Sequence, residues 1–204
     1  MNRNVFVLGL TGSIGMGKTT TAEMFRNAGV PVWDADEAVH RLYGPGGAAT
    51  EAVAAICPAA VSAVGVDRAA LRDWIANDAG ALHKLNAVVH PLVAQDRQEF
   101  IEAAAAKGVP LIVVDVPLLF ETGAESGVDA VLVVSAPAKV QKARVMARKG
   151  MTEEHYSRIL AHQIPDAEKR QRADYVIETT SLDVARQGVE DVIRDLTDRI
   201  ARDA

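Results

Sequence analysis

The chain has 204 residues, which suits one compact domain with an appended subdomain, or at most two small domains. Charged residues make up 24% and hydrophobic residues 49%, the balance of an ordinary globular protein, so wholesale disorder is not expected. Asp and Glu outnumber Lys and Arg by 27 to 22, and the net charge is −5. Nucleic-acid binders usually carry a basic excess, and we therefore expect no nucleic-acid partner.

The cysteine content and the hydropathy pattern exclude several further classes. Cys57 is the single cysteine, which rules out a disulfide framework within one chain and zinc sites that need two or four cysteines. No apolar run approaches the roughly 18 residues that a membrane helix needs. The first apolar run, 5–10, is too short for a signal-peptide core and leads into a glycine loop. We expect a soluble cytoplasmic protein that does not associate with membranes.

Short apolar runs alternate with helical patterns along most of the chain. Continuous apolar strands of this kind are typical of a parallel sheet covered on both faces, so the predicted fold class is α/β with a five-stranded sheet. The predicted strands are Val5–Leu10, Val30–Trp33, Leu111–Val116, Ala130–Val134 and Tyr175–Ile177. The predicted helices are Lys18–Ala28, Asp67–Ile75, Pro91–Lys107, Pro137–Lys149, Glu153–Gln163 and Leu182–Arg202.

The alternation is interrupted between residues 37 and 107, where the pattern is helical and contains no convincing strand. That stretch is far longer than a simple crossover between strands. We therefore expect a helical insertion at 37–107 beside a core made of 1–36 and 108–204. Helix-capping residues support these divisions: Asp67, Thr152 and Ser181 can cap helices that follow them, and Gly108 follows the long helix.

The strongest local signal is a glycine-rich loop at residues 12–19, GSIGMGKT, between a strand and an amphipathic helix. It matches the phosphate-binding loop pattern G-x-x-x-x-G-K-[ST] at every fixed position. Glycines let the backbone curl so that N–H groups face phosphate oxygens, and the helix N-terminus adds a positive field. Lysine then reaches the β and γ phosphates, and the threonine hydroxyl ligates Mg²⁺. The predicted nucleotide-binding residues here are Gly12, Gly15, Met16, Gly17, Lys18, Thr19 and Thr20.

The loop alone does not separate kinases from GTPases and transport ATPases. The chain has no Asn-Lys-x-Asp guanine reader, no Asp-x-x-Gly switch and no Leu-Ser-Gly-Gly-Gln signature. A small chain with an insertion after its second strand suits a small-molecule kinase. Two alternatives stay open: another small-molecule kinase, such as a nucleoside monophosphate kinase, and a nucleotide-dependent switch.

Two aspartates follow the second predicted strand. Ligands of open α/β sheets bind beyond the carboxyl ends of the strands, so Asp34 and Asp36 can face a transferred phosphoryl group and an attacking hydroxyl. The alternative is that one carboxylate caps a helix and the other is only solvated.

At these residues the chain resembles the dephospho-coenzyme A kinase family. The motifs occur in family order over nearly the whole chain: LTGSIGMGKT at 10–19, DAD at 34–36, NAVVHP at 86–91, VPLLFE at 116–121 and ADYVI at 173–177. The resemblance implies that ATP phosphorylates the ribose 3′-hydroxyl of dephospho-CoA, the last step of coenzyme A biosynthesis. It also implies a nucleotide-binding core, a helical insertion that binds dephospho-CoA, and a lid within about 140–172, with no obligatory protein partner.

The resemblance assigns roles to individual residues. Asp36 orients the 3′-hydroxyl and accepts its proton. The predicted catalytic residues are Asp36, Lys18 and Arg144. Arg144 and Arg148 lie four residues apart on a predicted helix, hence on one face, and lid arginines of the family approach the ATP phosphates. The alternative for both arginines is a solvated cationic face.

Further assignments concern the metal and the substrate. Asp115 ends an apolar strand and resembles a Walker B acid that holds Mg²⁺ with Thr19, or else it only caps the strand end. The predicted substrate-binding residues are Thr11, Asp36, His90, Pro117, Leu118 and Leu119. Core packing is the alternative for the proline and the leucines, and a structural role is the alternative for His90, which precedes Pro91 at an expected helix junction.

Three regions stay open at the sequence level. Glu121 either accepts a hydrogen bond or is solvated, and the basic cluster Lys169, Arg170 and Arg172 either steers anionic substrates or is exposed. The run 178–180, ETT, departs from the short polar run that many relatives carry near the adenine, which leaves the base contacts undefined. The apolar stripe of the last helix, from Val184 to Ile200, is expected to pack on the sheet.

Overall fold

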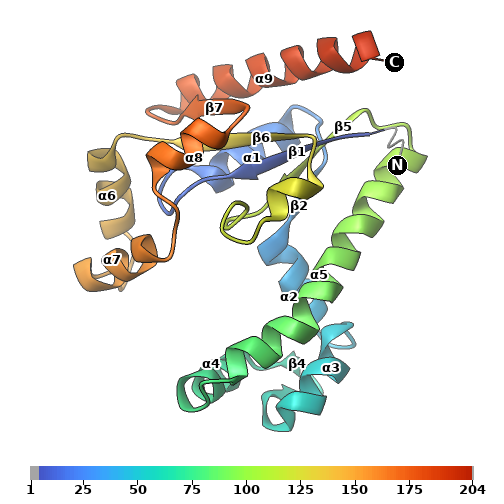
Figure 1. Cartoon of the computed structure of the whole chain (residues 1–204), viewed down its shortest axis with the longest axis vertical. Coiled ribbons are helices and arrows are strands. Elements are labelled where there is room, and N and C mark those ends of the chain that lie inside the picture. Colours follow the sequence, from blue (N-terminus) through green and yellow to red (C-terminus); the bar gives the residue numbers. More distant parts are fainter. Residues whose placement is uncertain (1–4, 204) are drawn as a thin grey trace. The chain divides into compact units, whose positions relative to one another are not determined.

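The computed structural model describes residues 5–203 and contains a five-stranded parallel sheet (Figure 1). The strand order across the sheet is β2-β5-β1-β6-β7. The strands are β1 (Phe6–Thr11), β2 (Val32–Asp34), β5 (Leu111–Asp115), β6 (Ala130–Ser135) and β7 (Tyr175–Glu178). All five predicted strands are therefore confirmed, with bounds that differ by two residues or fewer.

Helices make up most of the remaining chain. They are α1 (Lys18–Asn27), α2 (Ala35–Tyr43), α3 (Ala49–Ile56), α4 (Arg68–Asn77), α5 (Ala81–Ala106), α6 (Ala138–Met146), α7 (Glu153–Ala161), α8 (Asp166–Arg172) and α9 (Leu182–Asp203). Short 3₁₀ turns lie at Pro58–Ala60 and Ala124–Gly127. Within residues 5–203, no helix combines the length and the apolar character needed to cross a membrane.

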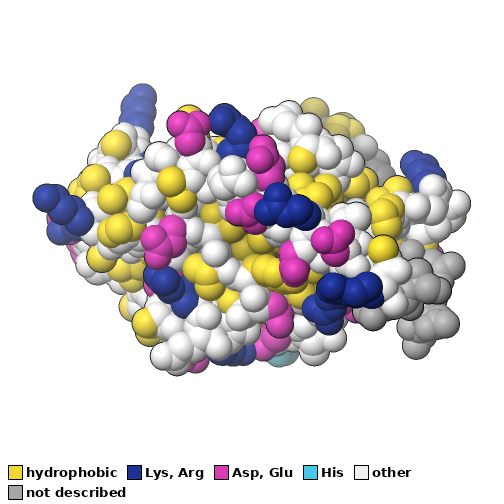
Figure 2. Space-filling view, turned by 90° about the horizontal axis from the view of Figure 1, so that it is seen from above, with side chains coloured by type: hydrophobic (Ala, Val, Ile, Leu, Met, Phe, Trp, Pro, Cys, Tyr) yellow, Lys and Arg dark blue, Asp and Glu magenta, His cyan; other side chains and the backbone are white. Residues whose placement is uncertain are grey.

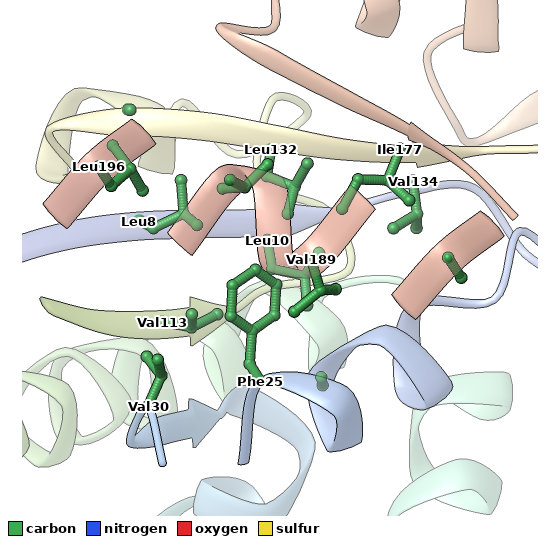
Figure 3. Close-up of a cluster of buried hydrophobic side chains, with 14 of the residues drawn as sticks. Leu8, Leu10, Phe25, Val30, Val113, Leu132, Val134, Ile177, Val189 and Leu196 are labelled. Atoms are coloured by element: carbon green, nitrogen blue, oxygen red, sulfur yellow. The ribbon is translucent and has the colours of Figure 1, made fainter. Parts of the chain in front are cut away.

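The main core lies between the sheet and the helices α1 and α9 (Figure 3). Alternate residues of β1 and β6 point to this face, where Leu10 and Leu132 are fully buried. Phe25 of α1 and Leu196 of α9 are also fully buried in this cluster. Because successive strand residues point to opposite faces, the apolar runs of these strands supply both sides of the sheet.

A second cluster covers the opposite face. Val131 and Val133 of β6 pack there with Leu119 and Phe120, which belong to the turn after β5. Ile164, just before α8, is a partly buried neighbour of the same cluster. The sheet thus has apolar contacts on both faces, as its continuous apolar strands predict.

The expected packing of the last helix on the sheet is confirmed for most of its stripe. Val189, Val192 and Leu196 are buried in the main cluster, whereas Val184 near the start of α9 is 48% exposed. Along α9, Arg186 pairs with Asp183 and Arg194 pairs with Asp191. Figure 2 shows a face on which basic and acidic side chains are interspersed.

The described chain divides into two compact units. The first contains the residues up to Trp33 and those from Ala103 onward, and the second contains Asp34–Glu102. The expectation that the second unit has no strand is wrong, because β3 (Val61–Ser62) and β4 (Gly65–Val66) form an antiparallel hairpin. Two-residue strands are too short to show an alternating pattern in the sequence, which explains the miss.

The long helix of the insertion begins ten residues earlier than predicted. It starts at Ala81 and contains Pro91 in its interior, where we expected a helix start and a junction at His90. Proline lacks an N–H donor and normally ends or kinks a helix. Here Leu85 and Val89, one turn apart, are buried in the apolar cluster of the second unit, and this packing favours an uninterrupted helix.

Most cap predictions are confirmed. The Asp67 carboxylate accepts hydrogen bonds from the N–H groups of Ala69 and Ala70, and the Thr152 hydroxyl accepts one from His155. The Ser181 hydroxyl accepts one from Val184 at the start of α9. Gly108 follows α5 with a φ of 68°, in the left-handed region that glycine favours.

Two aspartates fix the starts of neighbouring strands in the same way. The N–H of Asp129 donates to the carbonyl of Val7 (2.8 Å), and its Oδ2 accepts from the N–H of Val7 (2.7 Å). Asp174 makes the same pair of bonds with Val131, at 2.9 and 2.8 Å. Each aspartate thereby fastens its strand to the next strand at the amino edge of the sheet.

We expect Asp174→Ala to lower the free energy of unfolding by about 1–3 kcal/mol, because it leaves the N–H of buried Val131 without an acceptor. Asp174→Asn keeps a side-chain oxygen and is expected to cost less. Urea unfolding of the two variants measures the difference. Equal losses in both variants would show that the acceptor at residue 174 is not what stabilises this strand start.

Candidate active site

The glycine-rich loop joins β1 to α1 and has the conformation that its glycines predict. Gly15 and Gly17 have φ angles of 78° and 89°, in the left-handed region that other residues rarely adopt. Gly17 directly precedes the first residue of α1, Lys18. The strand, loop and helix arrangement required of a phosphate-binding loop is therefore present.

The loop is also packed too closely for side chains at two of its glycines. A Cβ on Gly12 would lie 2.5 Å from Cγ2 of Val134 and 2.8 Å from its carbonyl oxygen. A Cβ on Gly15 would lie 2.5 Å from Cγ2 of Val145 in α6. Glycine at these positions therefore lets the loop backbone lie against β6 and α6.

The loop presents a row of backbone N–H donors. The N–H groups of Ile14 and Met16 are bound within the protein, by Gln163 and by the Ser13 carbonyl. Within residues 5–203, no acceptor binds the N–H groups of Gly15, Gly17, Lys18, Thr19 and Thr20. Such a row at a helix N-terminus is a binding site for an anion, because the N–H groups and the helix dipole are both positive there.

Lys18 forms an ion pair with Asp115 beside this loop. Its Nζ lies 2.6 Å from Oδ1 of Asp115, whose side chain is fully buried while that of Lys18 is 16% exposed. The register pairs Leu10 of β1 with Asp115 of β5, so the acid follows the same edge of the sheet as the loop. Asp115 thus holds Lys18 at the carboxyl ends of the strands, where ligands of such sheets bind.

The two residues predicted to ligate magnesium, Thr19 and Asp115, carry oxygen donors. Thr19 is an exposed residue in the first turn of α1, and Asp115 carries a buried carboxylate. Mg²⁺ prefers oxygen ligands, and substrate phosphates usually supply some of them. Among residues 5–203, no group of three or more His, Cys, Asp or Glu side chains has the arrangement of a metal site.

Thr179, the residue after β7, connects the phosphate loop to α6 through hydrogen bonds. Its hydroxyl donates to the Met16 carbonyl (2.7 Å) and accepts from Nη1 of Arg144 (3.0 Å). A Cβ on Gly17 would lie 3.0 Å from the same hydroxyl oxygen. Sequence reasoning treated residues 178–180 as a departure near the adenine and missed this contact, because no local pattern marks a residue 163 positions away from its partner.

The two predicted phosphate-binding arginines lie in different surroundings. Arg144 is partly buried and donates to both the hydroxyl and the carbonyl of Thr179. Arg148 is exposed and lies beyond α6, because the helix ends at Met146 and not at Lys149 as predicted. The expectation that both arginines share one helix face is therefore wrong.

The residues predicted to bind substrate in the first unit divide between buried and exposed. Thr11 is fully buried and its hydroxyl donates to the Pro117 carbonyl (3.1 Å). Leu119 is fully buried in the second apolar cluster, whereas Leu118 is 39% exposed. This packing favours a structural role for Thr11 and Leu119 and leaves Leu118 accessible.

In the second unit, the two aspartates of the DAD motif have different roles. Oδ1 of Asp34 accepts from the N–H groups of Asp36 (2.8 Å) and Glu37 (3.0 Å), so Asp34 caps α2 as its alternative reading proposed. Asp36 is exposed, and its carboxylate has no hydrogen bond or ion pair within residues 5–203. His90 is exposed on α5.

The pKa values of Tyr43 in α2 and Lys142 in α6 are shifted by their immediate surroundings. Burial raises the pKa of Tyr43, and the Arg68 guanidinium, 5.8 Å from the ring centroid, partly opposes that rise. A hydrogen bond from Lys142 of α6 to Glu153 of α7 raises the pKa of Lys142. Both groups stay in their ordinary protonation state near neutral pH, so neither shift supplies a proton donor or acceptor to the site.

A buried ion pair lies beside the loop after β5. Nζ of Lys169, a fully buried side chain, lies 2.7 Å from Oε1 of Glu121, which also accepts from the N–H of Ile164 (2.9 Å). Both readings offered for Lys169 are wrong, because it is neither exposed nor open to substrates. A lysine within a run of charged residues, KRQR, gives no sequence signal of burial.

Thr20, the last residue of the predicted nucleotide-binding set, lines a cavity of about 350 Å³ between α1 and α9. Leu182, Arg186 and Val189 line it from α9. The cavity therefore begins next to the phosphate-binding loop.

Comparison with known proteins identifies the family. The family model described as dephospho-CoA kinase matches residues 6–183. This chain belongs to the dephospho-CoA kinase family. A curated dephospho-CoA kinase from Cereibacter sphaeroides is 56% identical over 188 residues, which cover 92% of this chain and 94% of that protein.

Solved structures share the fold of this chain. A crystal structure of a protein from Thermus thermophilus is 34% identical, covers 94% of this chain and 97% of its own, and has a TM-score of 0.79. A dephospho-CoA kinase from Campylobacter jejuni, 22% identical, shares the fold with a TM-score of 0.68, over 95% of this chain and 98% of its own. The resemblance expected from the motifs of the dephospho-CoA kinase family is confirmed.

The loop geometry predicts a specific loss of nucleotide binding in one of two matched variants. Gly15→Ala and Gly108→Ala both place a side chain at a positive φ, at a strain of roughly 1–2 kcal/mol. Only the Gly15 variant also meets α6, whereas a Cβ on Gly108 meets nothing within 4 Å. We expect Gly15→Ala to weaken ATP binding about 10-fold or more, and Gly108→Ala to keep it.

Calorimetric titration with Mg-ATP measures both affinities, and thermal unfolding shows the shared strain. Equal affinities in the two variants would mean that the close contact between Gly15 and α6 does not hold the loop in its binding conformation.

Proposed function

We propose that this chain transfers the γ-phosphoryl group of ATP to the ribose 3′-hydroxyl of dephospho-CoA, giving coenzyme A and ADP. The observation that carries the proposal is the set of open N–H groups at Gly15 and at residues 17–20, with Lys18 held beside it by a buried acid, in a chain of the dephospho-CoA kinase family. Phosphoryl transfer needs alignment and charge neutralisation, and this edge of the sheet offers both.

The phosphate loop binds the triphosphate of ATP. Gly12 and the backbone of Gly15, Met16 and Gly17 shape the loop, and the N–H groups that follow bind phosphate oxygens. Lys18 reaches the β and γ phosphates as a point charge, and its ammonium group is oriented by the ion pair with Asp115. Lys18 acts in the transition state, where negative charge spreads over the transferred group.

Asp36 orients the acceptor hydroxyl and accepts its proton. Its carboxylate is exposed and is bound to no other group within residues 5–203, and the cap of α2 is supplied by Asp34 instead. A carboxylate left free in this way can accept a hydrogen bond from a substrate hydroxyl. In a loose transition state the hydroxyl loses its proton late, so an ordinary carboxylate suffices.

The Thr19 hydroxyl and Asp115 would hold the Mg²⁺ that accompanies ATP. When bound, the ion would supply charge neutralisation for the β and γ phosphates. Arg144, held by two bonds to Thr179 beside the loop, places a guanidinium near the transferred group, and Arg148 approaches the phosphates from the exposed turn between α6 and α7.

The helical insertion, about 37–107, binds dephospho-CoA, and the segment 140–172 acts as the lid. His90 and Leu118 are each exposed and therefore accessible to the substrate, which each of them contacts. Thr11, Pro117 and Leu119 support that contact through the hydrogen bond and the packing at the β5 end. The enzyme works in the cytoplasm without an obligatory protein partner, a nucleic acid or a membrane.

A substrate panel tests the reaction. ADP release with Mg-ATP is measured with dephospho-CoA, AMP, CMP or no acceptor, and the product is analysed by mass spectrometry and phosphorus NMR. We expect turnover with dephospho-CoA alone and a product with one phosphate added at the 3′ position. Turnover with a nucleoside monophosphate would overturn the assignment of dephospho-CoA as the substrate. ATP binding without acceptor-dependent turnover would favour a nucleotide-dependent switch protein.

The DAD motif offers a matched pair of variants. Asp36→Asn removes the proton acceptor, and we expect it to keep ATP affinity while lowering kcat by roughly 10²–10⁴. Asp34→Asn retains an oxygen that can cap α2, so we expect a far smaller change. Steady-state kinetics with dephospho-CoA measures both. Near-normal turnover in Asp36→Asn would remove Asp36 from the reaction.

A further inference from the structure

Both backbone groups of Ile14, in the middle of the phosphate loop, are bound by glutamine side chains. Nε2 of Gln141 donates to the Ile14 carbonyl at 2.8 Å. Oε1 of Gln163 accepts from the Ile14 N–H at 3.1 Å. Gln141 belongs to α6 and is buried, and Gln163 lies just after α7. The two side chains therefore come from opposite ends of residues 138–163, which we call the α6–α7 segment.

The two bonds use opposite ends of the glutamine amide. Gln141 acts as a donor and Gln163 acts as an acceptor, and a primary amide offers both functions. Glutamate affects the two bonds differently: a carboxylate still accepts at residue 163 but cannot donate at residue 141.

The position of Ile14 gives these bonds their consequence. Ile14 directly precedes Gly15, the first loop residue with a positive φ and the first of the open N–H donors. Gln163 holds the peptide unit before Ile14, and Gln141 holds the unit after it, which also carries the N–H of Gly15. With both units held, the following donors keep their common orientation. A loop fixed in this way binds phosphate without first paying the entropy of becoming ordered.

We propose that Gln141 and Gln163 are positioning residues that clamp the two peptide units flanking Ile14 and thereby hold the phosphate loop in its ATP-binding conformation. The proposal deepens the proposed kinase function and rests on it for the kinetic measurements. Because the clamp joins the loop to both ends of the α6–α7 segment, ATP binding and the conformation of that segment are coupled.

Four variants test the clamp. Gln163→Met and Gln141→Met keep the approximate length of the side chain but lose its hydrogen-bonding groups. We expect each to raise the KM for ATP about 3- to 10-fold, the effect of one lost hydrogen bond, and to leave the KM for dephospho-CoA unchanged. A merely structural loss would lower the melting temperature and change neither KM selectively.

The two glutamate variants separate the hydrogen bond from the added charge. Gln163→Glu and Gln141→Glu each place one negative charge beside Ile14, but only Gln163→Glu retains its bond to Ile14. We expect the KM for ATP to rise at least about 5-fold more in Gln141→Glu than in Gln163→Glu. Equal values in the two variants would overturn the clamp, because the effect would then be electrostatic alone.

A measurement without the acceptor substrate distinguishes failure of the clamp from failure of the proposed reaction. NMR amide exchange of Ile14 in the nucleotide-free protein is expected to be slow in the unmodified chain and in Gln163→Glu, and at least about 10-fold faster in Gln163→Met. Calorimetric titration with Mg-ATP then gives affinities whatever the acceptor is. Unchanged Ile14 exchange together with unchanged ATP affinity in Gln163→Met would refute the proposal.

Discussion

A phosphate loop works only if several peptide N–H groups converge on one anion, and convergence demands a backbone that no side chain disturbs. The surroundings of the loop in this kinase-family chain serve that requirement. Gly12 lies against the backbone of Val134, Gly15 lies against Val145, and Thr179 binds the Met16 carbonyl. Strand β6, helix α6 and the residue after β7 therefore each fix one part of the loop, and the loop's own Met16 side chain is buried in the main core, where it accepts from the N–H of Ala136.

The charges at the site are arranged by the same sheet edge. Parallel strands bring their carboxyl ends together, so Lys18 after β1 meets Asp115 at the end of β5 although the two are 97 residues apart in the chain. A lysine that faced only phosphates would keep a flexible stem, whereas the buried carboxylate restricts it to one direction. The proposed catalytic contribution of Arg144 depends on a comparable restraint from Thr179.

Local features of this fold were predictable from the sequence and long-range ones were not. The phosphate loop and the strands follow from fixed spacings and apolar runs, and the cap at Asp67 follows from its place before a helix. The burial of Lys169, the bridge at Thr179 and the glutamine clamp on Ile14 depend on partners far away in the chain, which no local pattern encodes. The roles assigned to Asp36 and His90 stay predictions.

The two aspartates at the strand starts stabilise the sheet at the edge opposite the phosphate-binding site. Asp129 and Asp174 fasten neighbouring strands at their amino ends, while the phosphate loop and Asp115 lie at the carboxyl ends. Thermal robustness of the sheet is thus adjustable at one edge while the catalytic edge is left intact. Sequence drift or engineering at the amino edge of the strands can retune the working temperature of the enzyme without altering its chemistry.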